Sequence, residues 1–367
     1  MINLKKVRKD LHRIPELAFE EFNTRDYLLR VLKNLPDIKV RTFDFPALLV
    51  EYKMNDGNFL LFRADMDGLP ITEETECDFR STHPGKMHAC GHDMHMSILL
   101  GLIEHVVKGR VQRNILFLFQ PAEETGGGAR HILEAGILDD YDISAAYALH
   151  VKGDYPVGTV ACRPGSFFAN TEEVDVTFLG RSAHVAFAEK GKDAVAAAVD
   201  FYQLLQRVIP EKFEDHYAIL CKFGIIKGGT VRNAVPAKCV LQGTLRALEL
   251  EDHQILESLV KEIAWQVAAD HDLECEVKIS NYYRAVVNDS QLYEVFKNKI
   301  ENSPYAFKTA PTQMGGEDFG FLADKYTGLL FLLGADGGNG ADLHAANFLP
   351  DENALEAGLN ILKMLIE

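Results

Sequence analysis

Three short apolar runs, each ending in charged or polar residues, constrain the fold of this chain more than any other feature. They are FLLFRADMDG at 59–68, NILFLFQPAEE at 114–124 and ISAAYALHV at 143–151. Continuous apolar runs of this length are typical of strands that are buried on both faces of a sheet. Between the first two, MSILLGLIEHVVKG at 96–109 predicts a helix that ends at Gly109. The alternation of strands and helices indicates an α/β layer architecture.

The ends of these runs carry side chains that are suited to chemistry. Asp65 and Asp67 end the first run, Glu123 and Glu124 the second, and His150 the third. Open α/β sheets bind ligands outside the carboxyl ends of their strands. We therefore expect these acidic groups and the histidine to meet in one crevice.

The middle of the chain has a different pattern. A half-buried strand, EEVDVTFLG, is followed by apolar residues at helical spacing, two further strands, a second helix and the strand LECEVKIS. This order is the split ferredoxin-like pattern. It predicts an inserted α+β domain at 172–282, acting as a lid or a dimerisation unit. The expected helical faces are Val195, Val199, Tyr202 and Leu205, then Leu256, Leu259, Ile263 and Val267.

The remainder predicts one discontinuous catalytic domain, formed by residues 1–171 and 283–367. TGLLFLLGADG at 327–337 is another buried apolar strand, and DLHAANF follows it. A helix with acidic and basic faces is expected at about 3–33. The acidic cluster TEETE at 72–76 is interpreted as solvated surface.

Charge and composition exclude several classes of partner. The 367-residue chain carries a formal net charge of −16 and has no Lys/Arg-rich run, so a nucleic acid would be repelled. The N-terminus lacks the apolar segment of a signal peptide, and no apolar run is long enough to span a bilayer. Six scattered cysteines without a CxxC pair predict reduced thiols in a cytoplasm.

The stretch KMHACGHDMHM at 86–96 places Cys90 beside His92. A thiolate and an imidazole are good ligands for zinc and similar metals. Taken alone, such a pair is more often a buried thiol beside a polar histidine than a metal site. Glu124, His150 and His344 strengthen the metal interpretation, because each follows or ends a strand-like segment, although a histidine there is often structural.

The pair of glutamates in PAEE at 121–124 is a more specific signal. Hydrolysis at a metal needs a ligand and a separate base, and adjacent carboxylates can fill both roles. An acidic pair on the surface is the commoner meaning of EE. It fits poorly here, because the pair directly follows ILFLFQ.

Seven motifs occur in an order that resembles the amidohydrolase branch of the aminoacylase-type dinuclear metallopeptidases. They are RADMDGLP, HACGHDMH, QPAEE, ALHV, GRSAH, MGGEDFG and LHAANF, and the opening LHRIPELAFEE matches too. The resemblance covers essentially the whole chain. It implies a zinc-peptidase-like α/β domain with a central mixed sheet, plus an inserted ferredoxin-like α+β lid or dimerisation domain.

The resemblance also implies roles for individual residues. Two divalent metal ions, which could be zinc, manganese, cobalt or nickel, would be held by Cys90, His92, Glu124, His150 and His344. Glu123 resembles the general base, Asp67 the aspartate that supports the site, and His184 a lid histidine that stabilises the oxyanion, in its own or a neighbouring subunit. Asn233 and Arg246 are candidate substrate-binding residues. The family pattern GHAAxPH is not continued, since Ala188 and Glu189 stand where Pro-His would be.

The expected activity is the removal of an acyl group from an N-acyl amino acid by a cytoplasmic homodimer. Within the branch, the motifs are most similar to N-acetyldiaminopimelate deacetylases, which act in lysine synthesis. Hippurate-type or indole-acetyl-amino-acid hydrolases, dipeptidases and a silent metal-binding scaffold are the alternatives, and the retained Glu123 speaks against the last. His88, His95 and Asp318 could support the site, whereas surface or structural roles are expected for His12, His83, His105, His131, His216, His253 and His271.

Overall fold

The computed structural model describes residues 2–213 and 218–366, which form two compact units. Unit 1 consists of Met1–Phe167, Val286–Pro311 and Glu317–Glu367, and unit 2 of Phe168–Ala285 and Thr312–Gly316. Unit 2 thus contains the segment where an insert was predicted, and it includes the short piece 312–316 as well. The roles of lid and dimerisation unit remain predictions.

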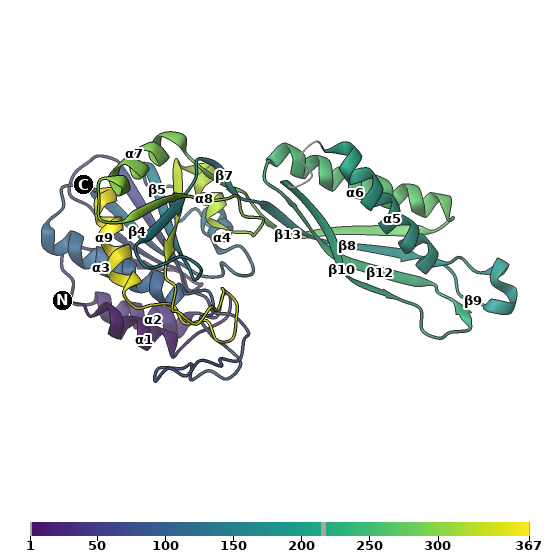
Figure 1. Ribbon diagram of the computed structural model, residues 1–367, viewed down its shortest axis with the longest axis horizontal. Helices are drawn as coiled ribbons and strands as arrows, with labels where there is room; N and C mark the ends of the chain where they lie inside the picture. Colours follow the sequence, from purple (N-terminus) through teal and green to yellow (C-terminus); the bar gives the residue numbers. More distant parts are fainter. Residues whose placement is uncertain (1, 214–217, 367) are drawn as a thin grey trace. The chain divides into compact units, whose positions relative to one another are not determined.

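Unit 1 is built around an eight-stranded sheet with the order β1-β2-β4-β3-β5-β16-β6-β15 (Figure 1). Its central strands β4, β3, β5 and β16 are parallel, whereas β1–β2, β2–β4 and β16–β6 pair antiparallel. The predicted mixed sheet in an α/β fold is therefore confirmed. The strands are β1 (Lys39–Thr42), β2 (Leu48–Tyr52), β3 (Phe59–Asp65), β4 (Asn114–Gln120), β5 (Ile143–Lys152), β6 (Thr159–Cys162), β15 (Ala306–Thr309) and β16 (Gly328–Gly334).

The apolar runs of the sequence form the central strands of this sheet. Every residue of β3, β4 and β16 is buried, because side chains that alternate along a buried strand meet packed side chains on both faces. Burial of each large apolar side chain contributes roughly 1.5–3 kcal/mol. β3 and β4 end at Asp65 and Gln120, so the candidate site residues Asp67, Glu123 and Glu124 follow the point where these buried strands stop.

Helices of unit 1 pack on the sheet and on one another (Figure 1). The long helix α3 (His92–Gly109) contacts both α1 and α9, and its side chains join the main core. Gly358 lets α9 lie close to α3, since a Cβ there would be 2.6 Å from Ile98 Cδ1. The others are α1 (Leu4–His12), α2 (Phe22–Leu32), α4 (Gly128–Glu134), α7 (Ser290–Glu301), α8 (Phe319–Lys325) and α9 (Ala354–Ile366).

The single helix predicted at about 3–33 is wrong, because the chain breaks between α1 and α2. Pro15 lacks an N–H and disfavours a helical conformation at the preceding residue. The carboxylate of Glu16 then accepts hydrogen bonds from the amides of Asn23 (3.2 Å) and Thr24 (2.8 Å) in the first turn of α2. The predicted helix at 96–109 does end at Gly109 but begins earlier, at His92.

Unit 2 contains a four-stranded antiparallel sheet with the order β10-β12-β8-β13, covered on one face by α5 and α6 (Figure 1). The observed chain order is the predicted strand, helix, strand, strand, helix, strand. Val199 was expected on the buried face of α5 but is 44% exposed, and Ala197, Ala198 and Phe201 fill that face instead. The elements are β8 (Asn170–Leu179), α5 (Ala194–Lys212), β10 (Ile219–Gly228), β12 (Lys238–Ala247), α6 (Leu250–Asp270) and β13 (Glu274–Tyr283).

The structure also contains several shorter strands and a 3-10 helix. In unit 2, β9 (Ala183–His184) pairs with β11 (Ala234–Val235), and a 3-10 helix, η1 (Val185–Lys190), follows β9. A further two-stranded sheet pairs β7 (Gly165–Phe168) with β14 (Val286–Asn288). Within residues 2–213 and 218–366, no helix is long and apolar enough to cross a membrane. His216, expected to be surface or structural, lies outside the described residues.

The acidic cluster at 72–76 is not uniformly solvated, which corrects the interpretation from sequence. Glu73 is buried, and its carboxylate accepts a hydrogen bond from the Ser81 amide at 2.6 Å. Glu73 also lies 3.3 Å from Nε2 of His12, whose Nδ1 lies 2.9 Å from Asp93. Hydrogen bonds to a charged group are stronger than those between neutral groups, and they compensate Glu73 for the water it loses on burial. Glu73 therefore connects an irregular loop to α1.

Candidate metal centre

The chain turns sharply between Cys90 and His92, and this turn places both side chains on the same centre. Gly91 has a φ of 82° and precedes α3, so His92 is the first residue of the helix. A Cβ at Gly91 would lie 2.4 Å from Val151 Cγ2, so only glycine allows β5 to come this close. Cys90 and His92 are both buried.

The imidazole of His92 is oriented by the backbone. Its Nδ1 lies 2.9 Å from the carbonyl oxygen of Asp67 and donates to it, which leaves Nε2 without a hydrogen-bond partner in the described chain. Nε2 instead faces carboxylates: Asp65 at 3.8 Å, and Glu123 and Glu124 at 3.9 Å each. Burial opposes a charge on His92, but Asp65 and Asp67 outweigh it and raise its pKa to about 10. The three carboxylates around Nε2 of His92 therefore favour a cation at this position.

The two adjacent glutamates are held by Asp67. Its carboxylate oxygens accept the amide hydrogens of Glu123 (3.0 Å) and Glu124 (2.9 Å). Ala122 before them has a φ of 57°, a conformation that non-glycine residues rarely adopt. This strained turn brings both carboxylates towards His92, and Oε1 of Glu124 is buried without a hydrogen-bond partner. Asp67 thus orients His92 through its backbone and both glutamates through its side chain.

His150 and His344 complete the arrangement. Nε2 of His150, near the end of β5, lies 3.3 Å from Sγ of Cys90. Nε2 of His344 lies 3.4 Å from Glu124 Oε1, and its side chain is half-exposed. Two groups could each hold a metal ion, and each has its ligand atoms within 4.8 Å of one another: Cys90 with His92 and His150, and Cys90 with Glu124 and His344. Cys90 belongs to both.

The chemistry of these groups fits metal ligands better than free acids and bases. Burial, and then the charges of Glu124 and Glu123, raise the pKa of the Cys90 thiol well above its usual range. Burial, and then Glu317, likewise raise the pKa of Glu123 well above its ordinary value. A divalent cation would favour the ionised forms and would satisfy the unpartnered atoms of His92 and Glu124. The residues present therefore fit a metal centre.

A second layer of polar residues supports the first. The guanidinium of Arg63 donates to Asp65 (2.7 Å) and Asp318 (2.6 Å) and forms an ion pair with Glu317 at 3.1 Å. The other carboxylate oxygen of Asp65 lies 2.6 Å from Nδ1 of His95. The Val151 amide donates to the remaining ring nitrogen of His95 at 2.9 Å, so that ring is fully engaged.

Sequence reasoning missed Arg63 and Glu317. Arg63 could have been found, since it is a charged residue within an otherwise apolar buried strand and must have buried partners there. Glu317 gave no separate signal, because its partner is remote in sequence. His88 is buried, with Nδ1 3.2 Å from the carbonyl oxygen of Asp67.

Three predicted site residues belong to unit 2. His184 lies on β9, which pairs with β11, and Asn233 directly precedes β11. Both residues are exposed. The Asn233 carbonyl accepts a hydrogen bond from the Val185 amide at 3.1 Å, so Asn233 lies beside the residue that follows His184. Arg246 on β12 is partly buried and donates to the Met314 carbonyl at 2.7 Å. Their catalytic and substrate-binding roles remain predictions.

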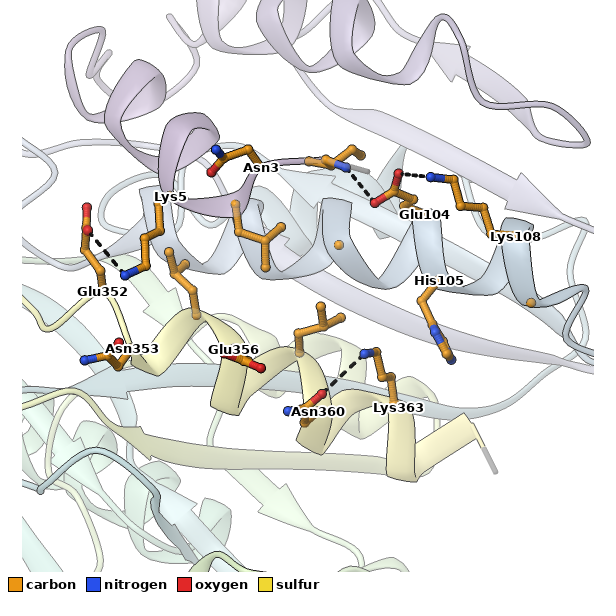
Figure 2. Close-up of a pocket in the computed structure, with 16 residues that line it drawn as sticks. Asn3, Lys5, Glu104, His105, Lys108, Glu352, Asn353, Glu356, Asn360 and Lys363 are labelled. Atoms are coloured by element: carbon orange, nitrogen blue, oxygen red, sulfur yellow. Dashed lines mark hydrogen bonds and ion pairs between the residues drawn. The ribbon is translucent and has the colours of Figure 1, made fainter.

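A cavity of about 730 Å³ lies elsewhere in unit 1, between α1, α3 and α9 (Figure 2). Leu4, Leu355 and Leu359 provide apolar lining. Its charged groups are largely paired with one another, as Glu104 is with Lys108. Its lining residues include none of the candidate metal ligands, so the cavity is distinct from the candidate metal centre.

The fold and the cluster of buried ligands define a class: an α/β protein with a candidate metal centre at the carboxyl ends of parallel strands. Residues 61–367 match the family model for Peptidase family M20/M25/M40, and the chain belongs to this family. Family membership confirms the predicted relationship to metallopeptidases and the prediction of a hydrolase that acts on amide bonds.

Relatives cover nearly the entire chain. Proteins named N-acetyldiaminopimelate deacetylase from Bacillus velezensis and Bacillus subtilis are each 38% identical, with 97% of this chain and 96% of the relative covered. A solved structure from Bacillus subtilis, described as a dinuclear metal-binding peptidase of the M20 family, is 30% identical with a TM-score of 0.86. The match covers 99% of this chain and 96% of that one.

Proposed function

We propose that this chain is a metal-dependent amidohydrolase that releases acetate from N-acetyldiaminopimelate, a step of lysine biosynthesis. The observation that carries the proposal is the pair of ligand groups that share Cys90, with Glu123 beside them. The names of the relatives, which match this chain over 97% of its length, support the choice of substrate.

Two divalent metal ions are proposed at this centre, held by Cys90, His92, Glu124, His150 and His344. When bound, they would lower the pKa of a water molecule and polarise the scissile carbonyl. Zinc, manganese, cobalt and nickel all suit such ligands. Elemental analysis of the purified chain would identify the metal, and a content of at least two ions per chain is expected.

The chain's own residues perform the proton transfers. Glu123 would accept a proton from the attacking water and deliver it to the departing amine. Asp67 keeps Glu123 and Glu124 in place through their amides. His184 would donate a hydrogen bond to the oxyanion that develops on the substrate carbonyl, and Asn233 and Arg246 would bind the amino-acid part.

Coordination by Cys90 can be tested without substrate. A coordinated thiolate is protected by the metal, whereas chelation would leave a thiol that can be alkylated. Metal should therefore slow the labelling of Cys90, and labelling of the partly buried Cys275 serves as an internal control. Equal labelling of Cys90 with and without metal would contradict coordination.

The activity is tested by measuring acetate release from N-acetyl amino acids, including N-acetyldiaminopimelate, with and without a chelator. Hippurate, indole-acetyl amino acids and dipeptides form the comparison set. Metal-dependent cleavage with the highest kcat/KM on N-acetyldiaminopimelate is expected. A preference for hippurate or a dipeptide would move the substrate assignment, and no cleavage by the metal-loaded chain would reject the enzyme proposal.

A homodimer formed through unit 2 is also proposed. Large apolar side chains are exposed on this unit, including Ile226 at 52% on the edge strand β10 and Val199 on α5. An apolar edge strand is a template for pairing with a second copy. Light scattering should show a dimer for the natural chain and a shift to monomer for Ile226→Lys, whereas an unchanged mass would reject this interface. We place the protein in the cytoplasm, where its six free cysteines would stay reduced.

A further inference from the structure

Unit 2 contains a second cluster of buried polar groups, formed by Glu172 on β8 and His253 on α6. Glu172 occupies the same face of β8 as Val174, Val176 and Phe178, which form the core under the helices. His253 lies on the buried stripe of α6 with Leu256 and Val260. A carboxylate and an imidazole thus stand opposite each other at positions where the pattern calls for apolar residues.

One side-chain atom of each group lacks the hydrogen bond that burial normally demands. Glu172 is 8% exposed and His253 is 2% exposed. Oε2 of Glu172 and Nε2 of His253 have no hydrogen-bond partner in the described chain, and they lie 3.7 Å apart. A direct hydrogen bond would require about 2.7–3.2 Å. Unsatisfied buried polar atoms are costly, so this pair calls for a further partner.

The spacing of the two atoms suits a metal ion between them. Zinc lies about 2.0–2.2 Å from carboxylate oxygen and imidazole nitrogen. Two ligand atoms 3.7 Å apart would then subtend an angle of about 125° at the ion, near the values of four-coordinate sites. The pair therefore accepts a cation without a large rearrangement.

Glu257 can supply a third ligand. It follows His253 by four residues on α6, and residues at this spacing share one face of a helix. His253 and Glu257 therefore project from the same side of α6 (Leu250–Asp270). Glu257 is partly exposed and pairs with Lys261 four residues further on, so it connects the buried pair to the surface. Lys261 is the cation that neutralises it in the metal-free chain.

We propose that unit 2 holds a divalent cation of the zinc class between β8 and α6, bound by Glu172, His253 and Glu257. This site is separate from the proposed catalytic centre and does not depend on the activity assigned to it. Two carboxylates and one imidazole neutralise the ion and leave a position for water. The bound ion joins the helix to the sheet, so it stabilises the packing of unit 2.

The test measures zinc bound per chain after removal of metal and dialysis against a buffer of defined free Zn²⁺. Glu172→Gln and His253→Gln should each bind one zinc fewer than the natural chain. Glu173→Gln is the matched control, since Glu173 is the next residue of β8, is exposed, and accepts from Asn281 at 2.7 Å. This control should bind as much zinc as the natural chain.

A second readout follows unit 2 alone. Trp265, the single tryptophan, lies on α6, so its fluorescence reports the thermal unfolding of this unit. Zinc should raise the midpoint by several degrees in the natural chain and in Glu173→Gln, but not in Glu172→Gln. If Glu172→Gln and His253→Gln fail to fold, Glu257→Gln tests the site instead, because Glu257 is partly exposed. This variant should bind zinc more weakly and show a smaller zinc-induced rise of the Trp265 unfolding midpoint.

Equal zinc content and an equal rise of the Trp265 midpoint in the natural chain and the variants would overturn the proposal. The pair would then be a direct hydrogen bond after a small movement. The catalytic centre is tested separately: His92→Gln should lose metal from unit 1 without affecting the Trp265 transition, and an unchanged metal content in His92→Gln would count against the catalytic centre alone. Glu172→Gln with its zinc lost should still release acetate in saturating metal.

Discussion

The polar groups of the two units are held in different ways. In unit 1, His92 is fully buried and oriented by the Asp67 carbonyl, while the Asp67 carboxylate fixes the backbone of both glutamates. In unit 2, His184 on β9 and Asn233 just before β11 are both exposed, and Nδ1 of His184 accepts a hydrogen bond from the nearby Ala186 amide. Unit 1 thus presents a preorganised set of candidate ligands, whereas we expect the predicted catalytic groups of unit 2 to be ordered by substrate or by another subunit.

The largest effect is expected where the preorganised centre performs the chemistry. Glu123→Gln keeps the shape of the side chain but cannot accept a proton, so kcat should fall by at least about 10²–10⁴. Metal content should remain that of the natural chain, because Glu124 is untouched. Rate and elemental analysis are measured on the same sample. Near-normal turnover in a fully loaded variant would remove Glu123 as the base.

A smaller loss of about 10²–10³ in kcat is expected for His184→Ala, since this removes one oxyanion donor. Metal content should not change. Glu189→Ala, on the exposed helix η1 that follows, is the control and should keep normal kcat. Normal kinetics for His184→Ala would show that the exposed histidine has no catalytic role.

Mixing subunits sharpens the comparison between the two units. If His184 acts on the site of a partner, a mixed dimer of His184→Ala and Glu123→Gln has one site with both residues intact. Partial recovery of activity is then expected after verified exchange of subunits. No recovery from two inactive variants would place His184 in the site of its own chain.

Asp67→Asn tests how the preorganisation is built. The amide nitrogen of asparagine would face a backbone N–H, so one of the hydrogen bonds to Glu123 or Glu124 is lost. Metal affinity should fall by about 10–100-fold, measured by competition with a coloured chelator. Asp56→Asn, at a fully exposed position, should bind metal normally. An unchanged metal affinity in Asp67→Asn would show that the turn at Ala122 keeps its conformation without both hydrogen bonds to the Asp67 carboxylate.

The smallest effect concerns the loop anchor beneath the centre. Burial disfavours a charge on His12, but Asp93 and Glu73 outweigh it and raise its pKa to about 9, above the value near 6.5 of an unfolded histidine. A raised pKa stabilises the folded state below pH 6.5, and this contribution is lost as pH rises through 9. Hydrogen exchange at α1 amides should therefore quicken from pH 6.5 to 9, after correction for intrinsic rates. His12→Gln should flatten this dependence, and parallel profiles would contradict it.

Much of the site could be predicted because its residues follow local patterns. Runs such as ILFLFQ predict buried strands, and PAEE directly after one places two carboxylates at a strand end. The break after α1 was missed because the apolar periodicity continues in α2, although Pro15 marks it. Val199 was assigned to the wrong face because small alanines fill the contact with the sheet, and periodicity weighted towards large residues overlooks them.

The sequence by itself determined the alternation of buried strands and helices and predicted the candidate ligands, since each depends on residues close together in the chain. Only the tertiary structure decided which atoms of those ligands are left unpartnered. Asp67 accepts from Glu123 and Glu124 across more than fifty residues, and Arg63 meets Asp318 across 255. The same is true of Glu172 and His253, because only the packing of β8 against α6 leaves one buried atom of each without a hydrogen-bond partner in the described chain. Hydrogen-bond satisfaction depends on three-dimensional neighbours, which the spacing of residues along a chain does not specify.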